Sequence, residues 1–122
     1  MVKITLTGDA PSKKNSKQII YVRGKPLIIP SKNHKTWHTQ VISQLYGIKP
    51  VTRQIECVEI KFYPSTKRMF DLSNKAESIM DLLVDGGIIE DDNYSVVPEL
   101  NLKFGIHDKQ NPRAEITIYD QE

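Results

Sequence analysis

The amino-acid sequence predicts an α+β protein, a single domain over residues 1–122 in which two helices pack on a mixed, mainly antiparallel β-sheet. Three observations predict this class. Segments with the two-residue alternation of strands and segments with the 3.6-residue repeat of amphipathic helices follow one another along the chain. The length of 122 residues suits one domain. With 39% apolar residues the chain can bury one core, and no repeat or linker divides it.

The first predicted strand covers residues 2–7, where apolar and polar residues alternate. A β-hairpin is expected next. Residues 19–22 (IIYV) and 27–29 (LII) are apolar, and they flank the turn-forming residues 23–26 (RGKP).

The first helix is expected over about residues 33–46, with Ser31 as its N-cap. Its apolar stripe consists of Trp37, Val41, Ile42 and Leu45. The clearest strand follows at residues 55–63 (IECVEIKFY). Alternation places Val58, Ile60 and Phe62 on its core face, and Ile55, Cys57, Glu59, Lys61 and Tyr63 on its open face.

The second helix is expected over about residues 73–85, and Gly86-Gly87 ends it in a left-handed C-cap. Its apolar stripe consists of Ala76, Ile79, Met80 and Leu83. Ile88-Ile89 is a short buried stretch. Two late strands, at about residues 99–106 and 114–119, complete the predicted sheet.

The net charge of +2 hides a strong division between the two halves of the chain. Residues 1–68 carry a net charge of +10 and residues 69–122 a net charge of −8, which indicates a polyanionic partner or an acidic site. The single cysteine cannot form an intramolecular disulfide, which favours a reducing compartment. No apolar run has the length of a membrane span or a signal peptide. We therefore expect a cytoplasmic protein with no membrane partner.

The residues best suited to catalysis gather between positions 67 and 92. The acidic and amide side chains of this stretch are Asp71, Asn74, Glu77, Asp81, Asp85, Asp91, Asp92 and, in the same turn, Glu90. Asp71 precedes the second helix, and a short extended return after that helix would bring the turn at residues 91–92 back beside it. Hard cations such as Mg²⁺ prefer carboxylate oxygens and use few protein ligands. Such a set could hold a metal that activates water at a phosphate.

Each of these side chains also has a simpler interpretation. Asp71 could serve only as an N-cap, Glu77 and Asp81 could form a solvated helix face, and residues 91–92 could be an ordinary surface turn. The large basic half favours the chemical interpretation. A phosphodiester enzyme needs acidic residues for its metal and basic residues for its phosphates.

The stretch from Arg68 to Asp92 resembles the signature of the RusA family of Holliday-junction resolvases, small endodeoxyribonucleases of bacteria, phages and prophages. The matching residues are Arg68-Met69-Phe70-Asp71-Leu72-Ser73-Asn74, then Met80-Asp81-Leu82-Leu83, then Gly87 and Glu90-Asp91-Asp92. The similarity in length and element order covers nearly the whole chain. It implies a RusA-like α+β fold, a homodimer, and Mg²⁺-dependent cleavage of symmetrically related strands at four-way DNA junctions, with Mn²⁺ as a substitute.

The resemblance also implies roles for individual residues. Asp71 and Asp92 match family aspartates that hold the metal, and Asp91 matches the acidic neighbour of the second. Two positions depart from the family: Ser73 stands where the best-known members have a catalytic aspartate, and Glu77 where they have a functionally important lysine. We hypothesise that Glu77 compensates for Ser73. The catalytic residues and metal ligands would then be Asp71, Glu77 and Asp92, with Asp91 in support.

The basic residues have a candidate role in DNA binding, because Lys, Arg and amide side chains donate to phosphate oxygens. The predicted DNA-binding residues are Lys13, Lys14, Asn15, Lys17, Lys67, Arg68 and Lys75. Lys75, or Lys67 with Arg68, would also replace the lysine that the family has at position 77.

Two aromatic residues and two histidines allow more than one interpretation. Trp37 is expected in the core, and Phe70 is suited equally to core packing and to contact with unstacked bases. His34 and His38 are four residues apart, but no third metal ligand lies near them in the sequence. A helix surface or a DNA-facing pair is therefore expected.

The predicted function is a Mg²⁺-dependent endodeoxyribonuclease that resolves branched DNA as a homodimer in recombination and repair. Two alternatives remain open. One is a RusA-like protein that binds branched DNA with little or no catalysis. The other is a domain of the same architecture that binds a ligand other than nucleic acid.

Overall fold

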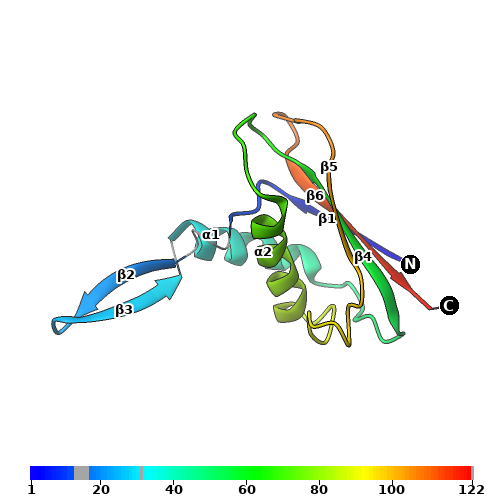
Figure 1. Ribbon diagram of the computed structural model, residues 1–122, viewed down its shortest axis with the longest axis horizontal. Helices are drawn as coiled ribbons and strands as arrows, with labels where there is room; N and C mark the ends of the chain where they lie inside the picture. Colours follow the sequence, from blue (N-terminus) through cyan, green and yellow to red (C-terminus); the bar gives the residue numbers. More distant parts are fainter. Residues whose placement is uncertain (13–16, 31, 122) are drawn as a thin grey trace.

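The structure is a computed structural model that describes residues 1–12, 17–30 and 32–121. The predicted residues Lys13, Lys14, Asn15 and Ser31 lie outside this part of the chain. A four-stranded sheet with helices against one face forms the body, and a two-stranded hairpin extends from it (Figure 1). The α+β class is confirmed. None of the described helices is long and apolar enough to cross a bilayer.

The sheet has the strand order β1-β6-β4-β5, formed by β1 (Val2–Thr7), β6 (Arg113–Asp120), β4 (Ile55–Tyr63) and β5 (Leu100–Phe104). β6 pairs antiparallel with β1 and β4, whereas β5 runs parallel to β4. Two neighbouring parallel strands need a crossover connection. The crossover contains helix α2 (Leu72–Asp85), so the segment with most of the candidate carboxylates lies on one face of the sheet.

The core lies between this face and α2. The side chains that are fully buried there include Val58, Ile60, Ile79, Leu82, Leu83 and Ile118. Each contributes about 1.5–3 kcal/mol through its removal from water. The apolar stripe predicted for the second helix is therefore confirmed. Because this stripe faces the sheet, Ser73 and Glu77 lie on the exposed side of α2.

The first helix is shorter than predicted. α1 (Lys32–Val41) continues as a 3-10 helix, η2 (Ile42–Leu45), so the hydrogen-bond pattern changes within the predicted range. Trp37 is 8% exposed and belongs to the core, as expected. His38 Nε2 lies 2.9 Å from Asp85 Oδ2. This pair connects α1 to the end of α2, which agrees with a helix-surface role for His38.

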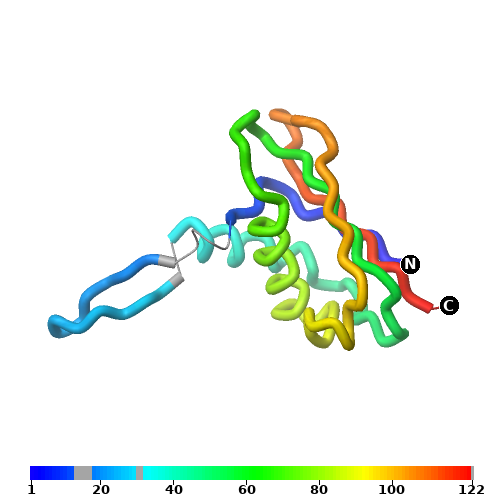
Figure 2. Tube along the Cα trace, in the orientation of Figure 1, coloured from blue at the N-terminus to red at the C-terminus, as the bar shows by residue number. Residues whose placement is uncertain are grey.

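The hairpin consists of β2 (Lys17–Val22) and β3 (Lys25–Pro30), which pair only with each other within the described residues. Arg23 and Gly24 form the two-residue turn, with φ values of 53° and 78°. Two successive positive φ values are typical of the type I′ turn, whose twist suits a hairpin. The hairpin extends away from the sheet and from both helices (Figure 2).

Two residues that were expected on the open face of β4 are buried. Cys57 is 9% exposed, and its Sγ accepts a hydrogen bond of 3.4 Å from Asn101 Nδ2 of β5. Ile55 is 5% exposed and belongs to the core. The pairing of β4 with β6 shifts register between Ile55 and Cys57, and such a bulge reverses the side on which the preceding residue lies. Ile88 and Ile89 are buried as predicted; both backbone N–H groups donate to the Leu83 carbonyl after the turn at Gly87.

Candidate functional site

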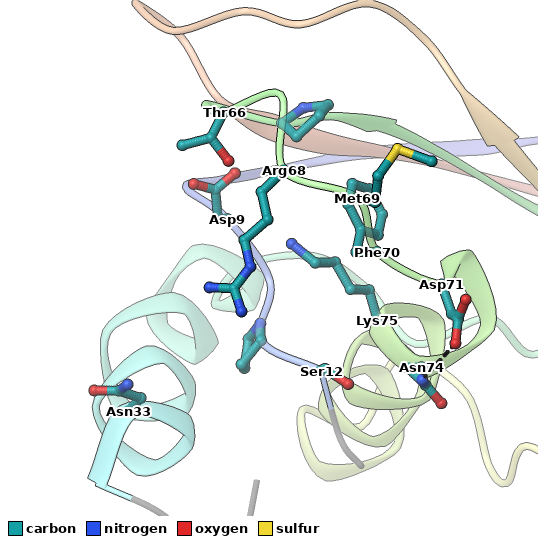
Figure 3. A pocket seen from close by; sticks show the side chains of 12 residues that line it. Asp9, Ser12, Asn33, Thr66, Arg68, Met69, Phe70, Asp71, Asn74 and Lys75 are labelled. Carbon is teal, nitrogen blue, oxygen red and sulfur yellow. Dashed lines mark hydrogen bonds between the residues drawn. The ribbon is translucent and has the colours of Figure 1, made fainter. Parts of the chain in front are cut away.

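Asp71 occupies the N-cap position of α2, but its side chain does not cap the helix. Its backbone is extended (φ −86°, ψ 126°), and its carboxylate makes no capping hydrogen bond. Asp71 Oδ2 instead accepts a hydrogen bond of 3.2 Å from Asn74 Nδ2 (Figure 3). An N-cap aspartate ordinarily accepts from a backbone N–H of the first turn. Helix capping therefore does not account for this exposed carboxylate.

A cleft of about 660 Å³, which we call the Asp71 cleft, lies beside this carboxylate (Figure 3). Its lining residues are Asp9, Pro11, Ser12, Asn33, Pro64, Thr66, Arg68, Met69, Phe70, Asp71, Asn74 and Lys75. They come from the loop after β1, the start of α1, the segment that joins β4 to α2, and the first turn of α2. The fold thus brings the predicted residues Arg68, Asp71 and Lys75 to one cleft.

Lys75 and Phe70 form one wall of the Asp71 cleft. Phe70 is half-buried and packs edge-to-face on Phe62, with 6.1 Å between the ring centroids. Lys75 Nζ lies over the Phe70 ring, 4.2 Å from its centroid. Burial lowers the pKa of Lys75, while the nearby negative charge of Asp9 acts in the opposite direction. Phe70 therefore packs against the protein and against the Lys75 ammonium group. Its neighbour Met69 is the exposed side chain at this edge of the cleft, with 92% of its surface open to solvent.

Asp9 is a lining residue that the sequence analysis did not select. Its carboxylate accepts hydrogen bonds from Ser65, one from the backbone N–H at 3.0 Å and one from Oγ. These bonds join the loop after β1 to the loop after β4. The sequence does mark Asp9 as unusual, because no other acidic residue occurs before Glu56. It does not reveal that Asp9 bonds to Ser65, because the two residues are 56 positions apart.

A second cleft, of about 270 Å³, lies between α2 and β5, and we call it the Glu77 cleft. Its lining residues are Ser73, Ala76, Glu77, Met80, Asp92, Val97, Leu100 and Leu102. The structure thus brings Glu77 and Asp92 to the same cleft, together with the Ser73 hydroxyl. Asp71 lines the other cleft. In the described part of the chain, no three Asp, Glu, His or Cys side chains are grouped so that they could hold a metal ion.

Asp91 shapes the turn that carries Asp92. Asp91 Oδ1 accepts a hydrogen bond of 2.7 Å from the backbone N–H of Asp92, and Asp91 Oδ2 accepts one of 3.0 Å from Asn93 Nδ2. Both carboxylate oxygens are therefore used within the turn. Asp92 is exposed at the Glu77 cleft. Asp91 therefore orders the turn that carries Asp92, and its supporting role in catalysis stays a prediction.

The predicted DNA-binding residues are only partly placed. Arg68 and Lys75 line the Asp71 cleft, and Lys67 is exposed next to them in the chain. Lys13, Lys14 and Asn15 lie outside the described residues, as does the side chain of Lys17. Ser12, the last described residue before them, lines the Asp71 cleft.

Comparison with known protein families gives a match. The family model described as "Endodeoxyribonuclease RusA" matches residues 8–119, which includes both clefts and every predicted site residue. No curated protein matches the chain.

Proposed function

The chain belongs to the RusA family of endodeoxyribonucleases, and from that premise we propose that it resolves four-way DNA junctions by Mg²⁺-dependent, paired symmetric nicks. One observation carries the proposal. The start of α2 lies between a cleft with two cations, Arg68 and Lys75, and a cleft with two carboxylates, Glu77 and Asp92. Phosphodiester cleavage requires both kinds of group close together.

The donor atoms of these clefts suit Mg²⁺. Carboxylate and hydroxyl oxygens are ligands for hard cations, and Mg²⁺ is commonly held by one or two carboxylates while it keeps several waters. Glu77 and Asp92 would hold the ion, with the Ser73 hydroxyl beside them and Asp71 at the adjoining cleft. When bound, the metal would supply an activated water and stabilise negative charge on the scissile phosphate.

The protein groups around the metal would position the DNA. Arg68 and Lys75 would neutralise phosphate oxygens next to the cut, and the Phe70 ring would hold the Lys75 side chain in place. Asn74 would fix the orientation of Asp71 through their hydrogen bond. Asp91 would keep the turn closed so that Asp92 stays at the Glu77 cleft.

The test is incubation of the purified protein with a synthetic mobile four-way junction and Mg²⁺, followed by mapping of the nicks. The wild type is expected to cut symmetrically related strands. Asp71→Asn, Glu77→Gln and Asp92→Asn are each expected to lower the cleavage rate by about 100-fold or more, because each removes a charge from the catalytic set. Glu56→Gln is the matched control, because Glu56 is an exposed carboxylate that lines neither cleft. Full activity of Asp71→Asn and Asp92→Asn would contradict the site.

A second candidate function is binding of branched DNA without cleavage. It is favoured by Ser73 at the position of a family aspartate and by the lack of a three-acid group in the described residues. The same assay separates the two functions. A salt-sensitive shift of the junction without nicks, in either Mg²⁺ or Mn²⁺, would establish the second.

A further inference from the structure

A further cleft, of about 600 Å³, lies between helix α1 and the end of β1, and we call it the α1 cleft. Part of its wall is apolar, because the buried residues Trp37 and Val41 line it. The polar side chains that α1 contributes to this cleft are those of Lys32, Asn33, Thr36 and Gln40. The set contains one cation, two amides and a hydroxyl, and no acid.

The amides and the hydroxyl form a row along one face of α1. Asn33, Thr36 and Gln40 are three and four residues apart, the spacing that makes side chains neighbours on a helix surface. At 1.5 Å per residue, the row is about 10 Å long from Asn33 to Gln40. Nucleotides follow one another at about 3.4 Å along a stacked strand. The row is therefore about as long as three nucleotides.

The row keeps its hydrogen-bonding groups available to a ligand. Within the described part of the chain, the side chains of Asn33, Thr36 and Gln40 make no hydrogen bond to the protein. Gln44, one turn further on, differs from them. Its Oε1 accepts a hydrogen bond of 3.0 Å from the Thr7 backbone N–H, and its Nε2 donates one of 2.7 Å to Thr7 Oγ1. Gln44 thus joins the two sides of the cleft, and the three residues before it retain their donors and acceptors.

The charges at the α1 cleft favour a neutral ligand over a phosphate. Asp9 lines this cleft as well as the Asp71 cleft, and its carboxylate is held by Ser65. In the Asp71 cleft Arg68 and Lys75 offset that charge, whereas Lys32 is the single cation among the described lining residues of the α1 cleft. A phosphate beside Asp9 would be repelled. A nucleobase is uncharged, and its edge offers the donors and acceptors that amides and hydroxyls match.

The α1 cleft adjoins the Asp71 cleft. Asp9 and Asn33 line both of them. Figure 3 shows these two residues on the side of the Asp71 cleft that is away from Asp71. A DNA strand whose scissile phosphate lies at the start of α2 would therefore have its neighbouring nucleotides over α1.

We propose that the α1 cleft receives the bases next to the scissile phosphate, and that Asn33, Thr36 and Gln40 determine which DNA sequence is cut. This inference rests on the proposed function and deepens it, because it assigns the choice of cleavage site to side chains outside the catalytic set. Lys32 binds a phosphate of the same strand at the edge of the cleft. A well-placed contact to a base edge discriminates against the wrong base by about tenfold or more.

The first test maps cleavage on a mobile four-way junction whose homologous core places many different sequences at the crossover. The wild type is expected to cut at a few positions in Mg²⁺. Thr36→Ala and Gln40→Ala should each lower the ratio of the rates at the best and the worst position by about tenfold. Both side chains are exposed, so the fold should tolerate their loss.

Thr39→Ala is the matched control. Thr39 and Thr36 are the same residue type, both exposed and both on α1, but Thr39 lines none of the three clefts. Its cleavage pattern should equal that of the wild type. A wild type that cuts every position equally would overturn the inference. So would Thr36→Ala and Gln40→Ala proteins that keep the wild-type pattern, or that slow cleavage equally at all positions, because the contact would then be to the DNA backbone.

A second test does not depend on cleavage. Junctions carry a thioalkyl group, activated as a mixed disulfide, on one base within three nucleotides of the crossover, and are incubated with protein in Ca²⁺. Thr36→Cys should form a disulfide with the DNA in high yield. Thr39→Cys should not, nor should the wild type, whose single cysteine, Cys57, is buried.

The cross-link separates failure of the inference from failure of the proposed function. A cross-link at position 36 in a protein that makes no nicks in Mg²⁺ would contradict only the proposed function. Absence of that cross-link, or equal yields at positions 36 and 39, would overturn the inference whether or not the protein cuts DNA.

Discussion

At the scale of single residues, Lys75 is a partly buried lysine that lies over an aromatic ring and lines the Asp71 cleft. Its Nζ lies 4.2 Å from the centroid of the Phe70 ring, and burial lowers its pKa. A cation that has lost part of its water is poised to bind a phosphate, because less water must be displaced when DNA arrives. Asp9, on the far side of the cleft, moderates this effect.

Replacement of Lys75 should affect catalysis more than folding. Lys75→Met keeps the stem that covers Phe70 but removes the charge, and we expect single-turnover cleavage of the junction to slow by about 100-fold. Lys49→Met is the control, since Lys49 is exposed and lines neither cleft. Equal rates for the two variants would show that Lys75 has no role in cleavage.

The lowered pKa of Lys75 also predicts a pH dependence of stability. The folded protein releases this proton at a lower pH than the unfolded chain, whose lysines titrate near the ordinary value of 10.5. Between the lowered pKa and 10.5 the unfolded state binds more protons, so the contribution of Lys75 to the free energy of unfolding rises with pH. Urea denaturation across this range should show a steeper rise for the wild type than for Lys75→Met. Parallel curves would contradict the burial of the charge.

At the scale of elements, one hydrogen bond connects α2 to the loop after β1. Ser78 is fully buried on α2, and its Oγ donates to the Pro11 carbonyl at 2.8 Å. Pro11 and Ser12 line the Asp71 cleft and precede the predicted basic loop. The same helix thus carries the candidate carboxylates and holds the wall of the cleft in place.

Loss of this bond should loosen the wall. Ser78→Ala leaves the Pro11 carbonyl without its donor, which should cost about 1–3 kcal/mol of stability and should raise KM for the junction more than it lowers kcat. Ser43→Ala is the control, because the Ser43 hydroxyl makes its bond to Gln40 on the exposed surface. A Ser78→Ala protein with unchanged stability and unchanged KM would contradict this role.

The local patterns of the sequence predicted the elements well, because they depend on neighbouring residues. The repeats in residues 55–63 and 73–85 placed β4 and α2 close to their observed bounds. Features that depend on distant contacts were not predictable in this way. The Asp9–Ser65 and Ser78–Pro11 bonds join residues 56 and 67 positions apart. The bulge that turns Ile55 into the core arises from pairing with β6.

At the scale of the whole molecule, the division of charge follows the fold. The basic first half supplies β2, β3, α1 and one side of the Asp71 cleft, including Arg68. The acidic second half supplies α2, the turn with Asp92 and the cleft wall formed by Phe70 and Lys75. The two halves meet at the start of α2. A junction bound there would place its backbone on cations and its scissile phosphate next to carboxylates.

The affinity for DNA should therefore fall steeply as the salt concentration rises, and the Arg68 contact with phosphate should account for a measurable part of this dependence. Each phosphate contact releases counterions and contributes about −0.9 to the slope of log K against log salt concentration. Arg68→Ala should make this slope shallower by about 1 and weaken binding to all junction sequences alike. Fluorescence anisotropy with a labelled junction measures both quantities. A slope equal to that of the wild type would remove Arg68 from the DNA surface.

Cleavage of a supercoiled plasmid that extrudes a cruciform tests the central claim most directly, since it reports cutting and pairing together. Paired nicks across the junction give linear plasmid, whereas unpaired nicks give open circles. The proposed function predicts linear product in Mg²⁺ for the wild type, and supercoiled plasmid left intact by Asp92→Asn. A wild-type protein that binds the cruciform but leaves the plasmid supercoiled in both Mg²⁺ and Mn²⁺ would contradict it.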